Sequence, residues 1–231
     1  MKNICIIPAR KGSKRIKNKN IRLINNKPLI YYPIKLALDS NIFDKVLVTT
    51  DSKKIQNLAT KYGAISPFLR PKYLSNDFAL TRDVIKHAYN YFKNKFYTPD
   101  NICWIYPTSI LLESKDLIKS YNKLINKKKN LKIVFSVTNY SYPVLRSLKI
   151  KDDKIKMFFP KFRKYRSQDL EIIYHDAGLF YWGNNKIIEN NINTFSKYAS
   201  PYYIPNYKAQ DIDNLEDLEI AKLKFKNLFK K

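Results

Sequence analysis

Glycine and cysteine are scarce in this chain, with four and two residues respectively among 231. The glycine spacings of a P-loop and of a dinucleotide-binding fingerprint are both absent. Cys5 and Cys103 each lie inside an apolar run of strand length, which predicts small buried side chains and no disulfide. With only two histidines, far apart, a His/Cys zinc site is not supported. No apolar run reaches the roughly 18 residues that a membrane-spanning helix needs. We therefore expect a soluble, cytoplasmic protein without membrane partners.

Acidic residues are also few, since 44 Lys and Arg face 19 Asp and Glu and give a formal net charge of +25. Such a charge is compatible with nucleic-acid binding. The basic residues are spread along the whole chain, however, so we predict a solvated surface and no nucleic-acid partner. A non-enzymatic nucleic-acid-binding protein stays the alternative, because cations and aromatic rings alternate between Met157 and Arg166. That alternative predicts salt-dependent binding to oligonucleotides.

Apolar runs of strand length alternate with stretches of helical periodicity. We expect strands at 3–9, 45–50, 101–106, 132–138 and 179–182, and helices at 28–40, 52–62, 79–94, 114–128 and 215–228. Strands that are apolar throughout and separated by helices predict a parallel sheet covered on both faces. The expected fold class is α/β, Rossmann-like and doubly wound, with a mostly parallel sheet. Residues 142–172 interrupt this alternation, which predicts short strands or hairpins outside the main layers. We expect the whole chain, residues 1–231, to form a single domain.

The first expected strand leads into a basic loop. Small residues after a strand let backbone N–H groups converge on an anion, and neighbouring cations neutralise its charge. In open α/β sheets, ligands bind on the loops that follow the strands. Charge alone would equally fit a solvated loop. The residues concerned are Arg10, Gly12, Ser13, Lys14, Arg15, Lys19 and Asn20.

The order Pro-Ala-Arg-x-Gly-Ser-Lys-Arg, followed by Lys19-Asn20, resembles the nucleotide-binding loop of the cytidylyltransferases that activate nonulosonic acids, the sialic acid synthetase family. Further segments are similar to that family: Arg70-Pro71 with Leu74-Ser75, and Pro107-Thr108-Ser109 after the third strand. The resemblance implies transfer of CMP from CTP to the anomeric hydroxyl of an acidic nine-carbon sugar, with release of pyrophosphate. It implies catalytic roles for Lys14 and Arg15, and nucleotide contacts from Arg10, Gly12, Ser13, Lys19, Asn20, Arg70 and Ser75.

The sugar is the less constrained part of this prediction. Tyr106 stands where the family has a glutamine, which disfavours sialic acid. His175-Asp176-Ala177-Gly178, followed by Phe-Tyr-Trp, is similar to the branch of the family that acts on pseudaminic acid. N-acetylneuraminic and legionaminic acid stay alternatives. The resemblance implies sugar contacts from Tyr106, Thr108, Arg166, Gln168, Asp169, His175 and Asp176.

Residues 142–172 match the family's dimerisation arm in position. The resemblance therefore implies a homodimer in which Arg163 or Arg166 serves the active site of the neighbouring subunit.

Asp211-Ile212-Asp213 follows a segment expected to be extended. Residues i and i+2 of extended backbone point to the same side, so both carboxylates can face one cation while Ile212 turns to the core. Oxygen ligands suit Mg²⁺. The alternative is a helix start, with Asp213 or Asn214 capping the helix from Leu215. The family's Asp-x-Asp holds its catalytic metal, which implies Mg²⁺ at Asp211 and Asp213.

Two further polar residues are predicted to be structural. Asp51 ends the second strand and is expected to cap the helix that begins near Ser52. His87 is expected to be an ordinary helix residue.

Overall fold

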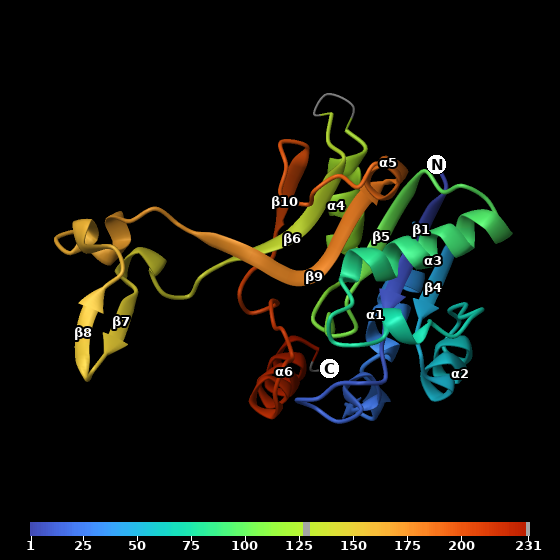
Figure 1. The fold of residues 1–231 in the computed structure, drawn as a ribbon, viewed down its shortest axis with the longest axis horizontal. Coiled ribbons are helices and arrows are strands. Elements are labelled where there is room, and N and C mark those ends of the chain that lie inside the picture. The colour runs from blue at the N-terminus through green and yellow to red at the C-terminus, as the bar shows by residue number, and fades with distance from the viewer. Residues whose placement is uncertain (127–129, 230–231) are drawn as a thin grey trace.

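The computed structural model describes residues 1–126 and 130–229. A six-stranded sheet forms the centre of the molecule (Figure 1). Its strands, in spatial order, are β10 (Ala199–Tyr203), β6 (Ile133–Asn139), β9 (Tyr174–Asn184), β5 (Asn101–Ile105), β1 (Asn3–Pro8) and β4 (Lys45–Thr49). Only β9 runs antiparallel to its neighbours. The predicted α/β class with a mostly parallel sheet is confirmed.

Helices cover both faces of this sheet. One face packs against α1 (Tyr31–Asp39), α2 (Lys53–Lys61) and α4 (Ser114–Leu124), and the other against α3 (Thr81–Lys95) and α5 (Asn185–Glu189). Side chains alternate along β1, so that Cys5 and Ile7 join the first face and Ile4 and Ile6 the second. Residues 4–7 of this strand are all apolar because a strand buried on both faces has no side that faces solvent.

The expected helices and strands mostly agree with the structure, although several bounds differ and the elements α5 and β10 are additional to those expected. The strand expected at 179–182 is the longer β9, Tyr174–Asn184. The helix expected at 114–128 ends at Leu124, and positions 127 and 128 lie outside the described residues. The C-terminal helix α6 spans Leu215–Leu228, as predicted.

A third core cluster lies away from the two faces of the sheet. It joins Ile16, from the loop after β1, to Ile110 and Leu111, after β5, and to Ile212 and Leu218, around the start of α6. Three segments distant in the sequence thus share one small core. The polar residues beside each of them are consequently brought to one place.

Strand β9 bends where it passes the predicted sugar-binding segment. Gly178 has φ +62°, a left-handed conformation that glycine adopts at little cost. The register between β6 and β9 shifts at this point, and the Ser136 hydroxyl accepts hydrogen bonds from the backbone N–H groups of Leu179 and Phe180 (3.2 Å each). The buried Ser136 hydroxyl therefore pairs with the two backbone N–H groups at the bulge, and the strand bends without leaving them unpaired.

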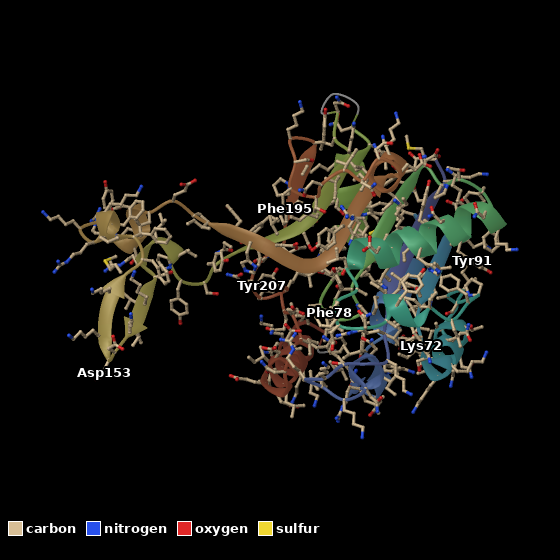
Figure 2. The ribbon with its side chains drawn as sticks, viewed as in Figure 1. Lys72, Phe78, Tyr91, Asp153, Phe195 and Tyr207 are labelled. Atoms are coloured by element: carbon tan, nitrogen blue, oxygen red, sulfur yellow. The ribbon has the colours of Figure 1, made fainter. Side chains whose placement is uncertain are left out.

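Residues between β6 and β9 form an arm that projects from the body of the molecule (Figure 1). It contains the hairpin of β7 (Leu148–Lys151) and β8 (Lys154–Met157), and Figure 2 labels Asp153 at its tip. Ile150 and Ile155 are 74% and 66% exposed there. The hairpin predicted within 142–172 is present, and it leaves large apolar side chains uncovered in the single chain.

The remaining elements are short. They are the two-stranded β2 (Leu23–Ile24) and β3 (Lys27–Pro28), and the 3₁₀ turns Lys19–Ile21, Lys72–Leu74, Val144–Arg146, Pro160–Phe162 and Ser167–Asp169. Over the ranges 1–126 and 130–229, no helix is long and apolar enough to cross a membrane.

Candidate active site

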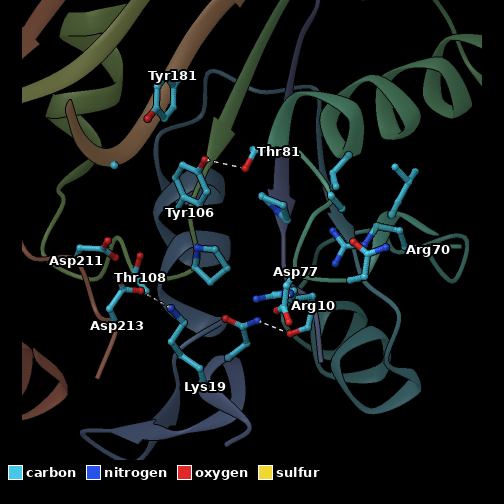
Figure 3. Close-up of a pocket in the computed structure, with 18 residues that line it drawn as sticks. Arg10, Lys19, Arg70, Asp77, Thr81, Tyr106, Thr108, Tyr181, Asp211 and Asp213 are labelled. Atoms are coloured by element: carbon cyan, nitrogen blue, oxygen red, sulfur yellow. Dashed lines mark hydrogen bonds and ion pairs between the residues drawn. The ribbon is translucent and has the colours of Figure 1, made fainter. Parts of the chain in front are cut away.

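A cavity of about 420 Å³ opens at the carboxyl ends of β1 and β5 (Figure 3). This is the edge where parallel α/β sheets bind their ligands. Its wall combines cations, carboxylates and tyrosines from segments far apart in the chain. The polar residues that line it are Arg10, Lys19, Asn20, Arg70, Asn76, Asp77, Thr81, Tyr106, Thr108, Tyr181, Asp211 and Asp213.

The loop after β1 supplies the cations on one side of the cavity. Arg10 places Nη1 2.7 Å from Asp77 Oδ1, and Lys14 places Nζ 2.6 Å from Asp77 Oδ2. Hydrogen bonds from Lys14 and Arg10 lower the pKa of Asp77. Asn20 is buried, and its side-chain amide donates to the Arg10 carbonyl oxygen (2.8 Å), so Asn20 fixes the backbone of the loop.

The tip of this loop lies beside the cavity and does not line it. Gly12, Ser13, Lys14 and Arg15 are absent from the wall, although Lys14 and Arg15 reach its carboxylates from outside. A Cβ atom added at Gly12 would meet no heavy atom within 4 Å, so a ligand has free access to the backbone there.

Asp51 does not cap the following helix, contrary to the prediction. Ser52, not Asp51, caps α2, with its Oγ accepting from Ile55 N (3.4 Å). The Asp51 carboxylate instead accepts the backbone N–H of Lys11 at 2.7 Å. The prediction was wrong because β1 and β4 are adjacent parallel strands, and the loops at their ends therefore meet. Asp51 thus supports the basic loop after β1.

Arg70 also lines the cavity, near Arg10, and is 5% exposed (Figure 3). Its backbone N–H donates to Thr50 O at 2.7 Å, and its Nε donates to Ser75 Oγ at 3.2 Å. Burial lowers the pKa of Arg70, and the charge of Asp51 partly offsets this. Ser75 does not itself line the cavity. Its hydroxyl instead accepts the hydrogen bond from Arg70, and its predicted nucleotide contact stays a prediction.

Asp211 and Asp213 both line the cavity, while the intervening Ile212 is fully buried. Asp213 Oδ1 lies 2.7 Å from Arg15 Nη2 and 3.7 Å from Lys19 Nζ. Lys19 Nζ also donates to the Ile212 carbonyl oxygen at 2.6 Å. Desolvation by the surrounding protein, followed by the negative charge of Asp213, raises the pKa of Asp211.

The helix start predicted as the alternative role of this segment is present, and Asn214 supplies its cap. Asn214 caps the helix, with its side chain accepting from Asp217 N at 2.9 Å and with Asp217 completing a capping box. The Asp213 side chain is consequently free of the helix start and turns into the cavity.

The two carboxylates fit a hard divalent cation. Oxygen ligands suit such ions, which often keep waters and take further oxygens from a bound phosphate. In the part of the chain that the structure describes, no group of three or more His, Cys, Asp or Glu side chains is placed to hold a metal. A cation at Asp211 and Asp213 would therefore complete its coordination with ligand oxygens and water.

A second cavity, of about 700 Å³, adjoins the first and shares Gly178 and Asp211 with it. Its wall includes Thr138, Asn139, Tyr140, Ser141, His175, Asp176, Asn206, Gln210 and Lys224. His175 Nδ1 lies 2.9 Å from the Asp176 carbonyl oxygen, and its ring packs against Tyr140. The predicted sugar residues His175 and Asp176 are thus brought next to Asp211.

A tyrosine stands at the junction of the two cavities. Asp176 Oδ1 accepts the backbone N–H of Gly178 (2.9 Å), and Asp176 Oδ2 accepts a short hydrogen bond from the Tyr181 hydroxyl. Burial and then this hydrogen bond raise the pKa of Tyr181. The local sequence predicts only a strand at Tyr181, and nothing in its pattern signals the contact with Asp176.

Tyr106 and Thr108, both predicted to contact the sugar, line the first cavity and not the second. The Tyr106 hydroxyl donates to Thr81 Oγ1 at 3.1 Å, and burial raises the pKa of Tyr106. Three other predicted sugar contacts, Arg166, Gln168 and Asp169, lie in the arm, line neither cavity and are exposed. Arg166 Nε pairs instead with Asp169 Oδ2 at 2.7 Å. His87, predicted to be an ordinary helix residue, lies in α3 with its ring against Phe68.

Residues 4–227 match the family model described as cytidylyltransferase. The chain is 41% identical over 227 residues to a pseudaminic acid cytidylyltransferase of Campylobacter jejuni subsp. jejuni serotype O:2, covering 98% of this chain and 97% of the relative. It is 34% identical over 224 residues to an N-acylneuraminate cytidylyltransferase of Escherichia coli O18:K1:H7, covering 95% of this chain and 51% of the relative.

Among solved structures, the CMP:2-keto-3-deoxy-manno-octonic acid synthetase complexed with CTP superposes with a TM-score of 0.72. The alignment covers 96% of this chain and 98% of the synthetase at 14% identity. At that identity the likeness concerns the fold alone. The family resemblance noted in the sequence is confirmed by the family match and by the relatives.

Proposed function

The chain belongs to the cytidylyltransferase family, and we propose that it transfers CMP from CTP to the anomeric hydroxyl of a nonulosonic acid, pseudaminic acid, releasing pyrophosphate. The observation that carries this proposal is the pair of adjoining cavities that share Asp211 and Gly178. One cavity has the cations that a nucleotide triphosphate requires. The other has the hydrogen-bonding groups that a sugar requires.

The nucleotide fits the first cavity by charge. Arg10, Lys19 and Arg70 line it, and Lys14 and Arg15 stand at its edge. Charge-assisted hydrogen bonds from these groups to phosphate oxygens are among the stronger polar interactions. We assign Arg10, Lys19 and Asn20 to the nucleotide directly, with Arg70 held in place by Ser75. The exposed backbone of Gly12 and Ser13 faces the β- and γ-phosphates.

The sugar fits the second cavity. Asp176 is fixed by Gly178 N–H and the Tyr181 hydroxyl, so one carboxylate is oriented at the passage between the two cavities. His175, Asn139 and Ser141 offer further polar groups along the same wall. Tyr106 occupies the position of the family glutamine and narrows the passage from the nucleotide side. We assign substrate selection to Tyr106, His175 and Asp176.

In the reaction, the anomeric hydroxyl oxygen forms a bond to the α-phosphorus, the bond from that phosphorus to the bridging oxygen breaks, and pyrophosphate leaves. The hydroxyl proton passes to solvent. The protein's part is positioning and charge stabilisation. Lys14 and Arg15 stabilise the negative charge of the leaving pyrophosphate, and Asp176 orients the sugar for in-line attack.

Cytidylyltransferases of this kind generally use a divalent metal. We assign Mg²⁺ to Asp211 and Asp213, where it would offset negative charge on the α-phosphate during transfer. Asp213 is meanwhile paired with Arg15, and Lys19 donates to the Ile212 carbonyl oxygen, so these two cations hold the segment that carries the carboxylates.

We also propose that the protein acts as a homodimer. The arm carries exposed apolar side chains, including Ile150, Ile155 and Phe158. Exposed apolar patches of this kind mark interaction sites. In a dimer the arm would cover these side chains and carry Arg163, Arg166, Gln168 and Asp169 to the cavity of the partner. The cytoplasmic location of the protein, and the absence of membrane and nucleic-acid partners, stay predictions.

The test is a substrate panel. The purified protein is incubated with CTP, Mg²⁺ and pseudaminic, N-acetylneuraminic or legionaminic acid in separate reactions, and pyrophosphate release is followed. We expect release with pseudaminic acid. Release with one of the other sugars alone would keep the reaction and replace the sugar. No release from folded protein with any sugar, together with salt-dependent oligonucleotide binding, would favour the non-enzymatic alternative.

A further inference from the structure

Asp77 forms ion pairs with two cations of the basic loop, Arg10 and Lys14. Its two carboxylate oxygens are divided between them, with Oδ1 2.7 Å from Arg10 Nη1 and Oδ2 2.6 Å from Lys14 Nζ. Both cations are among those assigned above to the nucleotide. In Figure 3 the Asp77 side chain lies against Arg10 at the wall of the nucleotide cavity. A carboxylate thus stands where a phosphate group would interact.

We infer that Asp77 is an internal competitor for the phosphate-binding cations: it occupies Arg10 and Lys14 before CTP binds, and it thereby weakens the binding of triphosphate and pyrophosphate more than the binding of monophosphate. This inference rests on the proposed function. Asp77 lines the nucleotide cavity, and its negative charge opposes the binding of the negatively charged nucleotide.

This unequal effect on the two nucleotides follows from the positions of the two cations. Arg10 lines the cavity, whereas Lys14 is 83% exposed at its edge and does not line it. A ligand must reach from the cavity to Lys14 to replace both contacts of Asp77. A triphosphate has phosphate groups for both cations. A monophosphate such as CMP replaces at most the contact with Arg10, so it displaces Asp77 only in part.

Asp77 can also move without uncovering a core. Its neighbour Phe78 is 91% exposed, and Leu80 is 60% exposed (Figure 2). The local hydrogen bonds at this turn stay within it, as from Phe78 N to Asn76 Oδ1 (2.9 Å). Displacing the carboxylate therefore breaks two ion pairs and little apolar packing. Pairs this exposed contribute weakly, so the expected effect is several-fold and not several hundredfold.

The experiment measures binding without turnover. Titration calorimetry with CTP, CMP and inorganic pyrophosphate is carried out on the wild-type chain, Asp77→Asn and Asp77→Ala, at fixed ionic strength and without sugar. We expect both variants to bind CTP and pyrophosphate about three- to tenfold more tightly, and CMP less than twofold more tightly. The matched control is Asp39→Asn, which removes one charge and one exposed ion pair, with Lys35 at 2.7 Å. The control should not change CTP binding.

Equal or weaker CTP binding by both Asp77 variants would overturn the inference, and would assign Asp77 to the ribose or the metal. An equal gain for CMP and CTP would also overturn it, since the effect would then be general electrostatics. A wild-type chain that binds no CTP would instead refute the proposed function. Thermal unfolding of each variant checks that the fold is intact.

Discussion

Arg15 and Asp213 form an ion pair, Nη2 to Oδ1 at 2.7 Å, although one follows the first strand and the other precedes the last helix. The residue beside each of them is apolar and buried, and these neighbours, Ile16 and Ile212, belong to the same core cluster. Burial of the two isoleucines fixes the two loops against each other. The basic loop and the acidic pair are consequently one structural unit.

The acidic pair is predicted to be essential. Asp213→Asn removes one of the two carboxylates available to a divalent cation, and we expect turnover to fall by about a hundredfold or more. Asp211→Asn should behave alike, and a chelator should abolish wild-type activity. Pyrophosphate release as a function of Mg²⁺ concentration measures this. Glu216→Gln, an exposed change in the first turn of α6, is the control and should keep activity.

Lys14 is predicted to stabilise the leaving pyrophosphate. Lys14→Ala should lower kcat/KM by about a hundredfold, corresponding to about 3 kcal/mol of transition-state stabilisation. Lys17→Ala changes an exposed lysine of the same loop and should have little effect. Nearly unchanged turnover in Lys14→Ala would show that the basic loop does not act on the phosphates.

Tyr106 is predicted to influence the choice of sugar. Its hydroxyl is held by Thr81, and its ring meets Tyr181 edge to face at 5.9 Å. Tyr106→Gln restores the family residue and opens space at the passage between the cavities. We expect the ratio of kcat/KM for N-acetylneuraminic acid to that for pseudaminic acid to rise by about tenfold or more. Tyr106→Phe keeps the ring and should leave this ratio nearly unchanged. An unaltered ratio in Tyr106→Gln would place sugar selection elsewhere.

A largely buried ion cluster of Lys208, Glu113 and Asp116 is predicted to contribute to stability. Lys208 Nζ pairs with Glu113 and lies 2.9 Å from Asp116 Oδ2, and both the Lys208 and Asp116 side chains are below 10% exposed. Lys208→Met leaves Asp116 buried without its cation, so we expect a loss of about 2 to 3 kcal/mol at pH 7. Lys222→Met, which breaks an exposed pair with Glu219, should change little.

The pH dependence of that loss follows from Glu113. Hydrogen bonds from Lys115 and then Lys208 lower the pKa of Glu113 below its ordinary value of 4.5. A lowered folded-state pKa gives stability that is present above the unfolded value and lost as pH falls through the folded one. The difference in melting temperature between wild type and Lys208→Met should therefore shrink as pH falls from 5 to 3. A difference independent of pH would contradict this assignment.

The arm is predicted to act on the partner subunit. Arg166→Ala and Asp213→Asn should each be inactive alone. If Arg166 serves the neighbouring cavity, mixed dimers contain one site with both residues intact, and an equal mixture should recover about a quarter of wild-type activity. If Arg166 serves its own chain, every site in the mixture lacks one residue and no activity returns. Subunits are mixed after reversible dissociation, and the activity is compared with each variant alone.

Several features of this protein were determined by local sequence. The apolar runs predicted the strands of the sheet, because a strand buried on both faces is apolar throughout. The helical periodicities predicted the covering helices, because a helix buried on one face carries apolar residues at helical spacing. The loop Arg10–Asn20 could be identified because its residues are contiguous and follow a strand. Asp211 and Asp213 could be paired because extended backbone alternates its side chains. α6 agrees with its predicted bounds because Asn214 carries its own capping signal.

The tertiary structure decided the rest, since the remaining contacts join residues that no local pattern relates. Asp51 supports the basic loop because β1 and β4 are neighbours in the sheet. A helix-cap prediction uses only the residues that directly follow Asp51 in the sequence, so it could not include this contact. The pairing of Asp77 with Arg10 and Lys14 depends on how two loops meet, and no local pattern predicts it. The antiparallel course of β9 and its bend at Gly178 place Asp176 against Tyr181. Periodicity records whether a residue is buried, whereas the choice of partner depends on which strands and loops become neighbours when the whole chain folds.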